Sequence, residues 1–304
     1  MKRVYFKKNI INVTYYCVPH LFKSIDIKYI IIIPIFKSLD SNERCSLLSL
    51  QKLVLEQKSV TITFIGLESI FEREYSLICD LLGTVDIKFE LFNPFYFSSI
   101  RTYNLLLTNP YFYKRFSQYL YLLIFQLDAY LIGVDLNKFM LKDYTFIGAP
   151  WFDDEGKENG ASMIGNGGFS LRKSKDFLRI LKNNSIVSQL FWRMYRPYNT
   201  LYRRLFKLLI LYPYKLYACI RRLPFELEWS KYNNVNEDVI FSSLFSMDDS
   251  FSIPDFKDAL EFSFECYPNK CYNLNNKNLP LGCHAWSRYD LDFWKSHLPD
   301  LRKF

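Results

Sequence analysis

The sequence contains little glycine and little proline, with only 10 and 12 of these residues among 304. This scarcity excludes collagen-like and low-complexity chains. A disordered chain has too little apolar surface to fold, whereas half of these residues are hydrophobic and only 23% are charged. The 23 Tyr, 28 Phe and 5 Trp residues supply enough buried surface for one large domain or two modest ones.

The chain also lacks a run of ~18 uncharged apolar residues, the length that a transmembrane helix requires. The nearest run, 119–134, contains Gln126 and Asp128, and Asn9 and Asn12 interrupt the N-terminal segment. The seven cysteines form no C-x-x-C pair, so we expect free, buried thiols and no disulfide framework. These features predict a cytoplasmic protein. A peripheral position on the inner face of a membrane is the alternative.

The net charge of +8 arises in one segment. Residues 187–225, called the basic segment here, hold eight of the 39 basic residues and no acidic one, which leaves 31 of each sign elsewhere. Leu201 and Leu205 fall on one helical face and Arg203 roughly opposite, which predicts an interfacial helix on an anionic membrane. A packed helix pair with a solvated basic face is the alternative. We expect no nucleic-acid partner, because no nucleic-acid-binding motif accompanies the charge.

Short apolar runs alternate with helical patterns along the first half of the chain. The continuous β-branched run at 28–36 predicts a strand buried on both faces, at the centre of a parallel sheet. The order of strand and helix that follows is typical of right-handed βαβ crossovers, so we predict an α/β fold. The further predictions are helix 41–57, strand 60–65, helix 68–82, strand 85–91, helix 100–116, strand 119–125, strand 144–149, a strand end or helix start at 170–181, helix 236–245, strand 259–264 and loop 269–280.

The strand predicted at 119–125 runs directly into Gln126-Leu127-Asp128. In open α/β sheets, ligands bind beyond the carboxyl ends of the strands. The Asp128 carboxylate and the Gln126 amide point to the same side of the chain, and one carboxylate can hold a divalent ion whose shell substrate phosphates complete. The alternative is that Asp128 only begins a turn.

Six of the ten glycines lie between residues 148 and 168, and three of them flank Asn166. A glycine cluster indicates unusual backbone or the close approach of a ligand. Its backbone N–H groups can bind a sugar or a phosphate, and Arg172 follows as a candidate for anion contact. The spacings of the dinucleotide fingerprint and of the P-loop are absent. A purely structural glycine corner is the alternative.

Two further motifs carry candidate chemistry. Asn236-Glu237-Asp238 places two carboxylates in the first turn of a predicted helix, where one can act as a general base. The helix dipole and an Asn cap also explain this pattern, and spacing does not decide which carboxylate acts. His284 is a candidate for metal or phosphate contact, or an ordinary hydrogen-bonded residue. Trp151 and Trp286 are candidates to stack on sugar rings, although most Trp residues are core.

In this order, the motifs resemble those of GT-A-type glycosyltransferases, and most closely an uncharacterised glycosyltransferase-like domain family. The likeness extends over about 29–294 and implies a GT-A-like, Rossmann-like α/β fold with a mixed, mainly parallel central sheet flanked by helices. It implies a single domain over 1–304, with a nucleotide-sugar-binding half at about 26–135, an acceptor or catalytic half at about 136–296 and the basic segment as a helical insertion. The motifs are Phe125-Gln126-Leu127-Asp128, Ile147-Gly148-Ala149-Pro150-Trp151, Gly165-Asn166-Gly167-Gly168-Phe169-Ser170-Leu171-Arg172, Asn236-Glu237-Asp238 and Cys283-His284-Ala285-Trp286.

The resemblance implies a hexosyltransferase-like, inverting enzyme of surface polysaccharide or glycoconjugate synthesis. Such an enzyme moves a sugar from a nucleotide-sugar donor, with a UDP-sugar favoured, to a hydroxyl of a glycan or lipid-linked acceptor. By the same likeness Asp238 is the catalytic base and Glu237 its neighbour, and a divalent Mn²⁺ or Mg²⁺ is held by Asp128 and His284. The implied donor contacts are Pro34, Phe36, Gln126, Asp128 and Arg172, and the implied acceptor contacts are Trp151, Asn166, Gly167, Gly168, Phe169 and Trp286.

Gln126 departs from the family pattern, because it replaces the first carboxylate of a D-x-D motif and brings no charge. This departure puts metal dependence in question. It also favours a rival from another class, a non-catalytic carbohydrate- or membrane-surface-binding protein that retains the fold. A glycoside hydrolase is a third alternative, but it needs two carboxylates that flank one bond and no diphosphate site.

Overall fold

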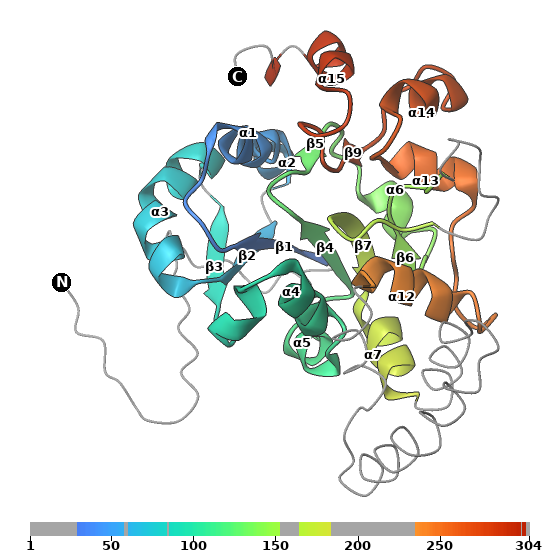
Figure 1. The fold of residues 1–304 in the computed structure, drawn as a ribbon, viewed down its shortest axis with the longest axis horizontal. Helices are drawn as coiled ribbons and strands as arrows, with labels where there is room; N and C mark the ends of the chain where they lie inside the picture. The colour runs from blue at the N-terminus through green and yellow to red at the C-terminus, as the bar shows by residue number, and fades with distance from the viewer. Residues whose placement is uncertain are drawn as a thin grey trace, which may run out of the picture.

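The computed structural model describes residues 29–57, 60–83, 85–152, 164–183, 235–298 and 300–301. Its centre is a six-stranded sheet in the order β3-β2-β1-β4-β7-β6, with helices on both faces (Figure 1). Three short strands form a second sheet in the order β5-β9-β8. The strands are β1 (Tyr29–Ile35), β2 (Thr61–Gly66), β3 (Asp86–Glu90), β4 (Tyr121–Phe125), β5 (Tyr130–Leu131), β6 (Phe146–Ile147), β7 (Phe169–Lys173), β8 (Ser263–Phe264) and β9 (Gly282–Cys283).

Strand β1 lies at the centre of the parallel part of the large sheet. It pairs in parallel with β2 on one side and with β4 on the other, and β3 continues the parallel order beyond β2. Strand β7 runs antiparallel to both β4 and β6. The prediction of a mixed, mainly parallel central sheet flanked by helices is therefore confirmed.

The side chains of β1 alternate between two hydrophobic clusters. Ile31 and Ile33 belong to the cluster on one face of the sheet, and Ile30 and Ile32 to the cluster on the other. Each of the four is at most 1% exposed. Full burial of one such side chain stabilises the fold by about 1.5–3 kcal/mol, which explains why a continuous β-branched run marks the central strand.

Two groups of helices cover the two faces of the sheet. Helices α1 (Ser41–Ser49), α2 (Gln51–Glu56) and α3 (Glu68–Leu82) pack against the face with Ile31. Helices α4 (Ile100–Leu107), α5 (Pro110–Arg115), α7 (Ser174–Lys182) and α12 (Glu237–Phe245) pack against the other face. The other helical elements are η1 (Pro94–Phe97), α6 (Asn137–Met140), α13 (Phe256–Phe262), α14 (Pro268–Leu274) and α15 (Leu291–His297).

Two of the predicted helices are each divided in the structure. The helix predicted at 41–57 consists of α1 and α2, which meet at Leu50. The helix predicted at 100–116 consists of α4 and α5, because the Asn109 side chain accepts a hydrogen bond from the Tyr111 N–H (2.9 Å) and Pro110 occupies the first helical position. An Asn cap followed by proline begins a new helix.

In the last third of the chain, the observed helices and strands differ more from those predicted. The strand predicted at 259–264 is wrong for most of its length, because α13 extends to Phe262 and only β8 is extended. Asp255 caps α13 by accepting a hydrogen bond from the Asp258 N–H (2.8 Å). The loop predicted at 269–280 contains most of α14, and the strand predicted at 144–149 is extended only in β6. These elements are short, so each carries little periodic signal.

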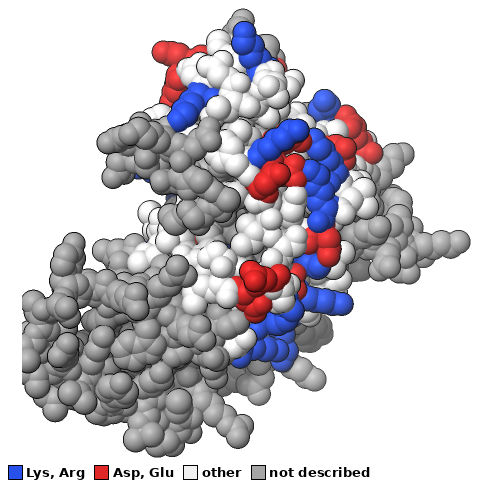
Figure 2. Space-filling model, turned by 90° about the vertical axis from the view of Figure 1, so that its right-hand side faces the viewer, with Lys and Arg blue, Asp and Glu red and all other residues white. Residues whose placement is uncertain are grey.

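Charged side chains of both signs lie side by side on the face of the molecule in Figure 2. Lys138 contacts Glu261 at 2.5 Å and Lys142 pairs with Asp258, so α13 is tied to the segment around α6. The basic segment, on which the predicted membrane contact depends, lies outside the described residues. Within the described ranges, no helix combines the length and the apolar character needed to span a bilayer.

The cysteines are not all alike. Cys45, Cys266, Cys271 and Cys283 are free, as expected, and three of them are buried. Cys79 is disulfide-bonded, so the expectation of a free thiol is wrong at this position. Most of the described cysteines are therefore free, and most of the free ones are buried.

Candidate active site

A cavity of about 940 Å³ opens beyond the carboxyl ends of β1 and β4. This edge is where open α/β sheets bind their ligands. The structure brings together here most of the residues that the sequence motifs single out. Those that line the cavity are Pro34, Phe36, Gln126, Asp128, Trp151, Asn166, Gly167, Gly168, Glu237, Asp238 and His284.

Asp128 reaches the cavity from the turn that follows β4. The Gln126 N–H donates to the Gly168 carbonyl (2.8 Å), so the segment after β4 stays fixed to the glycine-rich loop. The Trp286 N–H donates to the Asp128 carbonyl (3.3 Å), which ties the same turn to the segment that carries His284. The Asp128 side chain remains 48% exposed and faces the cavity.

The His284 imidazole lies between two carboxylates. Its Nε2 is 3.1 Å from Asp128 Oδ1, and its Nδ1 is 2.9 Å from Glu265 Oε1. Burial alone would lower the pKa of His284, but the contacts with the two carboxylates outweigh it and raise this pKa to about 10. Burial alone would raise the pKa of Asp128, but the contact with His284 holds it below its ordinary value. Without a metal, the two side chains form an ion pair.

The pair of His284 and Asp128 fits a divalent cation. Nε2 of His284 is buried and makes no well-aligned hydrogen bond. Its 3.1 Å separation from Asp128 Oδ1 suits neighbouring ligands of one ion, which lie about 3 Å apart when each bond is about 2.1 Å long. No described group of three or more His, Cys, Asp or Glu side chains is placed to hold a metal. Because Mg²⁺ and Mn²⁺ complete their shells with water and substrate phosphates, two side chains fit an ion that arrives with a diphosphate.

Gly167 and Gly168 leave room for the side chains of Glu237 and His284 beside the glycine-rich loop. A Cβ atom on Gly167 would lie 2.3 Å from Glu237 Oε1, and one on Gly168 would lie 2.0 Å from His284 Nε2. No side-chain atom fits at such distances. The glycine pair is therefore required by the close approach of Glu237 and His284 to the loop backbone, whatever ligand the cavity takes.

We expect Gly168→Ala to destabilise the protein by about 1–3 kcal/mol, because the new methyl group must push the His284 ring away from Asp128 and Glu265. Urea unfolding measures the effect. Gly133→Ala is the matched control, since its methyl group would meet the flexible Leu281 side chain at 3.2 Å. Equal unfolding midpoints for the two variants would show that the His284 ring is not confined by Gly168.

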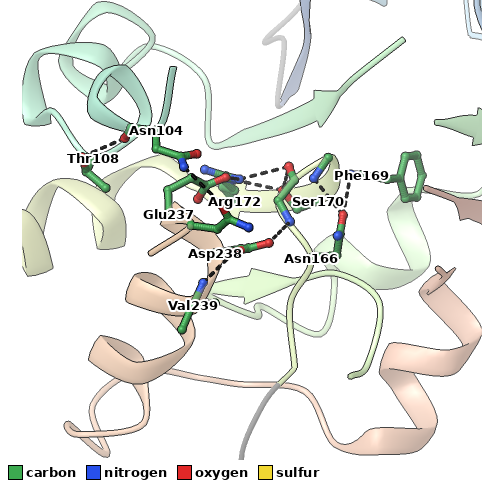
Figure 3. A network of polar contacts seen from close by, with 12 residues as sticks. Asn104, Thr108, Asn166, Phe169, Ser170, Arg172, Glu237, Asp238 and Val239 are labelled. Carbon is green, nitrogen blue, oxygen red and sulfur yellow. Dashed lines mark hydrogen bonds and ion pairs between the residues drawn. The ribbon is translucent and has the colours of Figure 1, made fainter. Parts of the chain in front are cut away.

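Glu237 is held by a buried ion pair with Arg172 (Figure 3). Arg172 Nη2 donates to Glu237 Oε1 (2.8 Å) and to the Gly167 carbonyl (3.1 Å), and Nη1 donates to the Tyr113 hydroxyl (3.0 Å). The exposed fractions of the Arg172 and Glu237 side chains are 0% and 4%. The second oxygen of Glu237, Oε2, has no hydrogen-bond partner although it is buried beside the cavity.

The start of α12 is anchored from α4. The Asn104 amide donates to Asn236 Oδ1 (3.2 Å), and the Thr108 hydroxyl donates to the Asn104 carbonyl (2.8 Å), as Figure 3 shows. Asn236 makes no side-chain cap of α12. The Asn-cap part of the alternative explanation is therefore wrong, and Glu237 and Asp238 are both buried rather than exposed at the helix start.

Asp238 accepts two backbone hydrogen bonds inside the cavity wall. Its Oδ2 accepts from the Gly167 N–H (3.1 Å) and its Oδ1 from the Val239 N–H (2.7 Å). These bonds favour the ionised form, but burial and, after it, the charge of Glu237 raise the pKa of Asp238 to about 7. A carboxylate with a pKa near neutral pH can take a proton and release it again.

Three selected residues are placed elsewhere than predicted. Arg172 is fully buried and does not line the cavity, so the prediction of direct donor contact is wrong. Phe169 is fully buried, stacks on Phe262 at 5.1 Å between ring centroids and does not line the cavity. Trp286 is 1% exposed and its Nε1 donates to the Ser46 hydroxyl (2.9 Å), so it belongs to the core.

Several cavity residues were not singled out by the sequence. Glu265 directly follows β8, which is the same position relative to a strand that singled out Asp128, so that rule could have found it. Tyr103 lies within α4, where a helical pattern gives no sign of function, and its hydroxyl is buried without a partner. Arg288 is exposed and lines the cavity, and it lies two residues beyond the last motif.

Comparison with known families places the chain in a family that has no assigned activity. The family described as "Protein of unknown function (DUF5672)" matches residues 86–284, and the chain belongs to this family. No curated protein matches the sequence.

Comparison with solved structures shows the type of fold. The apo form of mouse xyloside xylosyltransferase 1 is similar with a TM-score of 0.51 and 11% sequence identity, over 84% of this chain and 97% of that one. A glycosyltransferase involved in the glycosylation of the major capsid of PBCV-1 is similar with a TM-score of 0.41 and 14% identity, over 89% of this chain and 98% of that one. At such identities the likeness concerns the fold alone. The mixed α/β fold thus matches glycosyltransferase folds.

Proposed function

We propose that this member of the DUF5672 family is a glycosyltransferase that moves a sugar from a nucleotide-sugar donor to a hydroxyl group of an acceptor. One observation carries the proposal: a single cavity of about 940 Å³ holds the Asp128–His284 pair and the buried Asp238 carboxylate on its walls. The Asp128–His284 pair suits a metal-bound diphosphate, and the Asp238 carboxylate suits proton removal from a hydroxyl. We keep a UDP-sugar as the favoured donor and a glycan or lipid-linked acceptor as its partner.

The charge of the cavity supports a donor that binds together with a divalent cation. Among the described residues that line the cavity, six carry a carboxylate and two are Lys or Arg. Of these two, Lys37 is engaged by Asp40 (2.7 Å) and Glu43 (3.3 Å). A diphosphate would meet net negative charge on these walls, and like charges repel. An Mn²⁺ or Mg²⁺ ion held by Asp128 and His284 would supply the positive charge that stabilises the leaving diphosphate.

Asp238 is proposed as the general base. As the acceptor oxygen forms its bond to the anomeric carbon, its proton passes to the Asp238 carboxylate. The bond from the anomeric carbon to the diphosphate breaks, and its electron pair leaves with the diphosphate. This direct displacement inverts the anomeric centre, and general-base assistance of this kind contributes about 10²–10⁴-fold to a rate.

Buried polar atoms without partners support the binding of a hydroxyl-rich ligand in the same cavity. Glu237 Oε2 and the Tyr103 hydroxyl are both buried and unpartnered, and both residues line the cavity. Native proteins leave few such atoms unsatisfied, so a ligand or water is expected to complete them. Sugar hydroxyls can donate to the Glu237 oxygen, and Trp151 at the cavity wall can stack on a sugar ring.

The pH dependence of transfer tests the proposal. Because Asp238 must be ionised to accept a proton and its pKa is about 7, we expect kcat/KM to fall about tenfold for each pH unit below 7 and to level off above it. The measurement is release of nucleoside diphosphate from a panel of nucleotide-sugars between pH 5 and 9. A rate that follows an ordinary carboxyl pKa near 4, or no release from any donor, would count against the proposed role.

Cellular location and membrane contact stay predictions. A cytoplasmic position and contact of the basic segment with anionic lipid would suit a lipid-linked acceptor. Binding of the full chain to vesicles of neutral and of anionic lipid tests the membrane contact.

A further inference from the structure

Glu265 lies behind His284, on the side away from Asp128. It directly follows β8, which pairs in parallel with β9, and His284 directly follows β9. The His284 N–H donates to the Phe264 carbonyl (2.9 Å), so the two segments stay in register where they leave the small sheet. This register sets Glu265 Oε1 2.9 Å from His284 Nδ1.

The ring of His284 has little freedom in this position. The Gly168 backbone lies so close to its edge that even a methyl group there would fall 2.0 Å from Nε2. Glu265 holds Nδ1 at the opposite side of the ring, and the side chains of both residues are nearly buried, with 13% and 12% of their surfaces exposed. The remaining nitrogen, Nε2, has no aligned partner and faces Asp128 Oδ1.

We propose that Glu265 is a positioning residue, which holds the His284 ring so that Nε2 is presented to a divalent cation beside Asp128. The inference rests on the proposed function, because it concerns the cation of that site. A hydrogen bond from Nδ1–H to a carboxylate fixes the tautomer with a lone pair on Nε2 and raises the basicity of that lone pair. Glu265 itself does not contact the cation, since His284 separates it from Asp128.

The Asp128 and Glu265 carboxylates differ in exposure, and this difference assigns their roles. The Asp128 side chain is 48% exposed and faces the cavity, where a diphosphate and water can join it around an ion. The Glu265 side chain is 13% exposed, and its Oε1 contacts the ring nitrogen that points away from Asp128. Partners of this kind behind a metal-binding histidine typically change metal affinity by about 10–100-fold when they are replaced.

The test is the affinity of the full chain for Mn²⁺ alone, read from the electron paramagnetic resonance signal of free Mn²⁺. We expect Glu265→Ala to weaken Mn²⁺ binding about 10–100-fold. Glu265→Gln keeps an acceptor for Nδ1–H but loses the charge, so its affinity should lie between those of the wild type and of Glu265→Ala. Glu261→Gln is the matched control, because this nearby glutamate pairs with Lys138 and does not line the cavity.

A second readout follows the ring itself. In protein labelled with ¹⁵N in its three histidines, Mn²⁺ should broaden the His284 ring signals of the wild type and leave those of Glu265→Ala sharp at the same Mn²⁺ concentration. Unchanged circular dichroism shows that the variants are folded, and Glu265→Gln serves if Glu265→Ala is not.

The outcomes separate the two proposals. Folded Glu265 variants that bind Mn²⁺ as tightly as the wild type would overturn the positioning role and leave the transferase proposal intact. A wild type that binds no Mn²⁺, either alone or together with UDP, GDP, dTDP or CMP, would overturn the positioning role and the metal part of the transferase proposal. Nucleotide binding is measured separately, and it decides whether the proposal of a nucleotide-sugar donor site stands.

Discussion

Asp238→Asn should lower kcat for sugar transfer by about 10²–10⁴-fold while nucleotide binding stays unchanged. The substituted amide cannot take the proton of the acceptor hydroxyl. Its oxygen can still accept one of the two backbone hydrogen bonds, from the Gly167 N–H or the Val239 N–H, so the cavity wall should hold its shape. Release of nucleoside diphosphate measures the rate, and calorimetry measures the binding.

Asp255→Asn is a control for the change of charge. Asp255 caps α13 through the Asp258 N–H, outside the cavity, and Asn caps helices about as well as Asp. We expect this variant to transfer sugar at the wild-type rate. If Asp238→Asn also kept the wild-type rate, Asp238 would not be the base.

Arg172→Met should destabilise the protein by about 3–5 kcal/mol, because it leaves the Glu237 carboxylate buried without its counter-charge. The guanidinium also contacts the Ser170 and Tyr113 hydroxyls and lies 5.5 Å from the ring centroids of Phe146 and Phe177. Its removal therefore affects a whole buried network. Urea or guanidinium unfolding measures the loss.

A double variant distinguishes the buried charge from simple loss of packing. In Arg172→Met combined with Glu237→Gln, the carboxylate that would lose its counter-charge is also removed, so we expect part of the lost stability to return. Arg179→Met is the surface control: Arg179 is half exposed, contacts Asp176 at 3.5 Å, and should cost at most about 1 kcal/mol. Equal losses for Arg172→Met and Arg179→Met would contradict a buried ion pair.

The parallel half of the fold could be predicted because its pattern is local. The apolar runs of β1 and β4 are continuous, and α3 was predicted with its observed limits, Glu68–Leu82. Residues at the carboxyl ends of parallel strands meet at one edge of the sheet, so the sequence alone places Gln126 and Asp128 at the site.

The role of Arg172 could not be predicted, because it depends on the pairing of distant strands. Strand β7 lies between β4 and β6, so both of its neighbours bury it, and four of its five residues are buried. From sequence alone, an arginine after a glycine-rich loop suggests an exposed anion contact. Only the tertiary structure shows that Arg172 faces Glu237.

The difference between Trp151 and Trp286 has the same origin. Each follows a short apolar motif near the site, and nothing in the local sequence separates them. Trp151 lines the cavity, whereas Trp286 packs beside Tyr130 at 6.3 Å between ring centroids and donates to Ser46. Partners that lie 156 and 240 residues away in the chain decide the position of Trp286, and such contacts carry no short-range signal.

Calorimetric titration of the full chain with UDP, GDP, dTDP and CMP, each with Mn²⁺ and again with EDTA, tests the donor site most directly. We expect one nucleotide to bind with Mn²⁺ and to bind at least about tenfold more weakly with EDTA or in Asp128→Asn. Asp135→Asn, an exposed change whose oxygen can still accept from the Lys138 N–H, should bind like the wild type. Binding of no nucleotide under either condition would contradict the account.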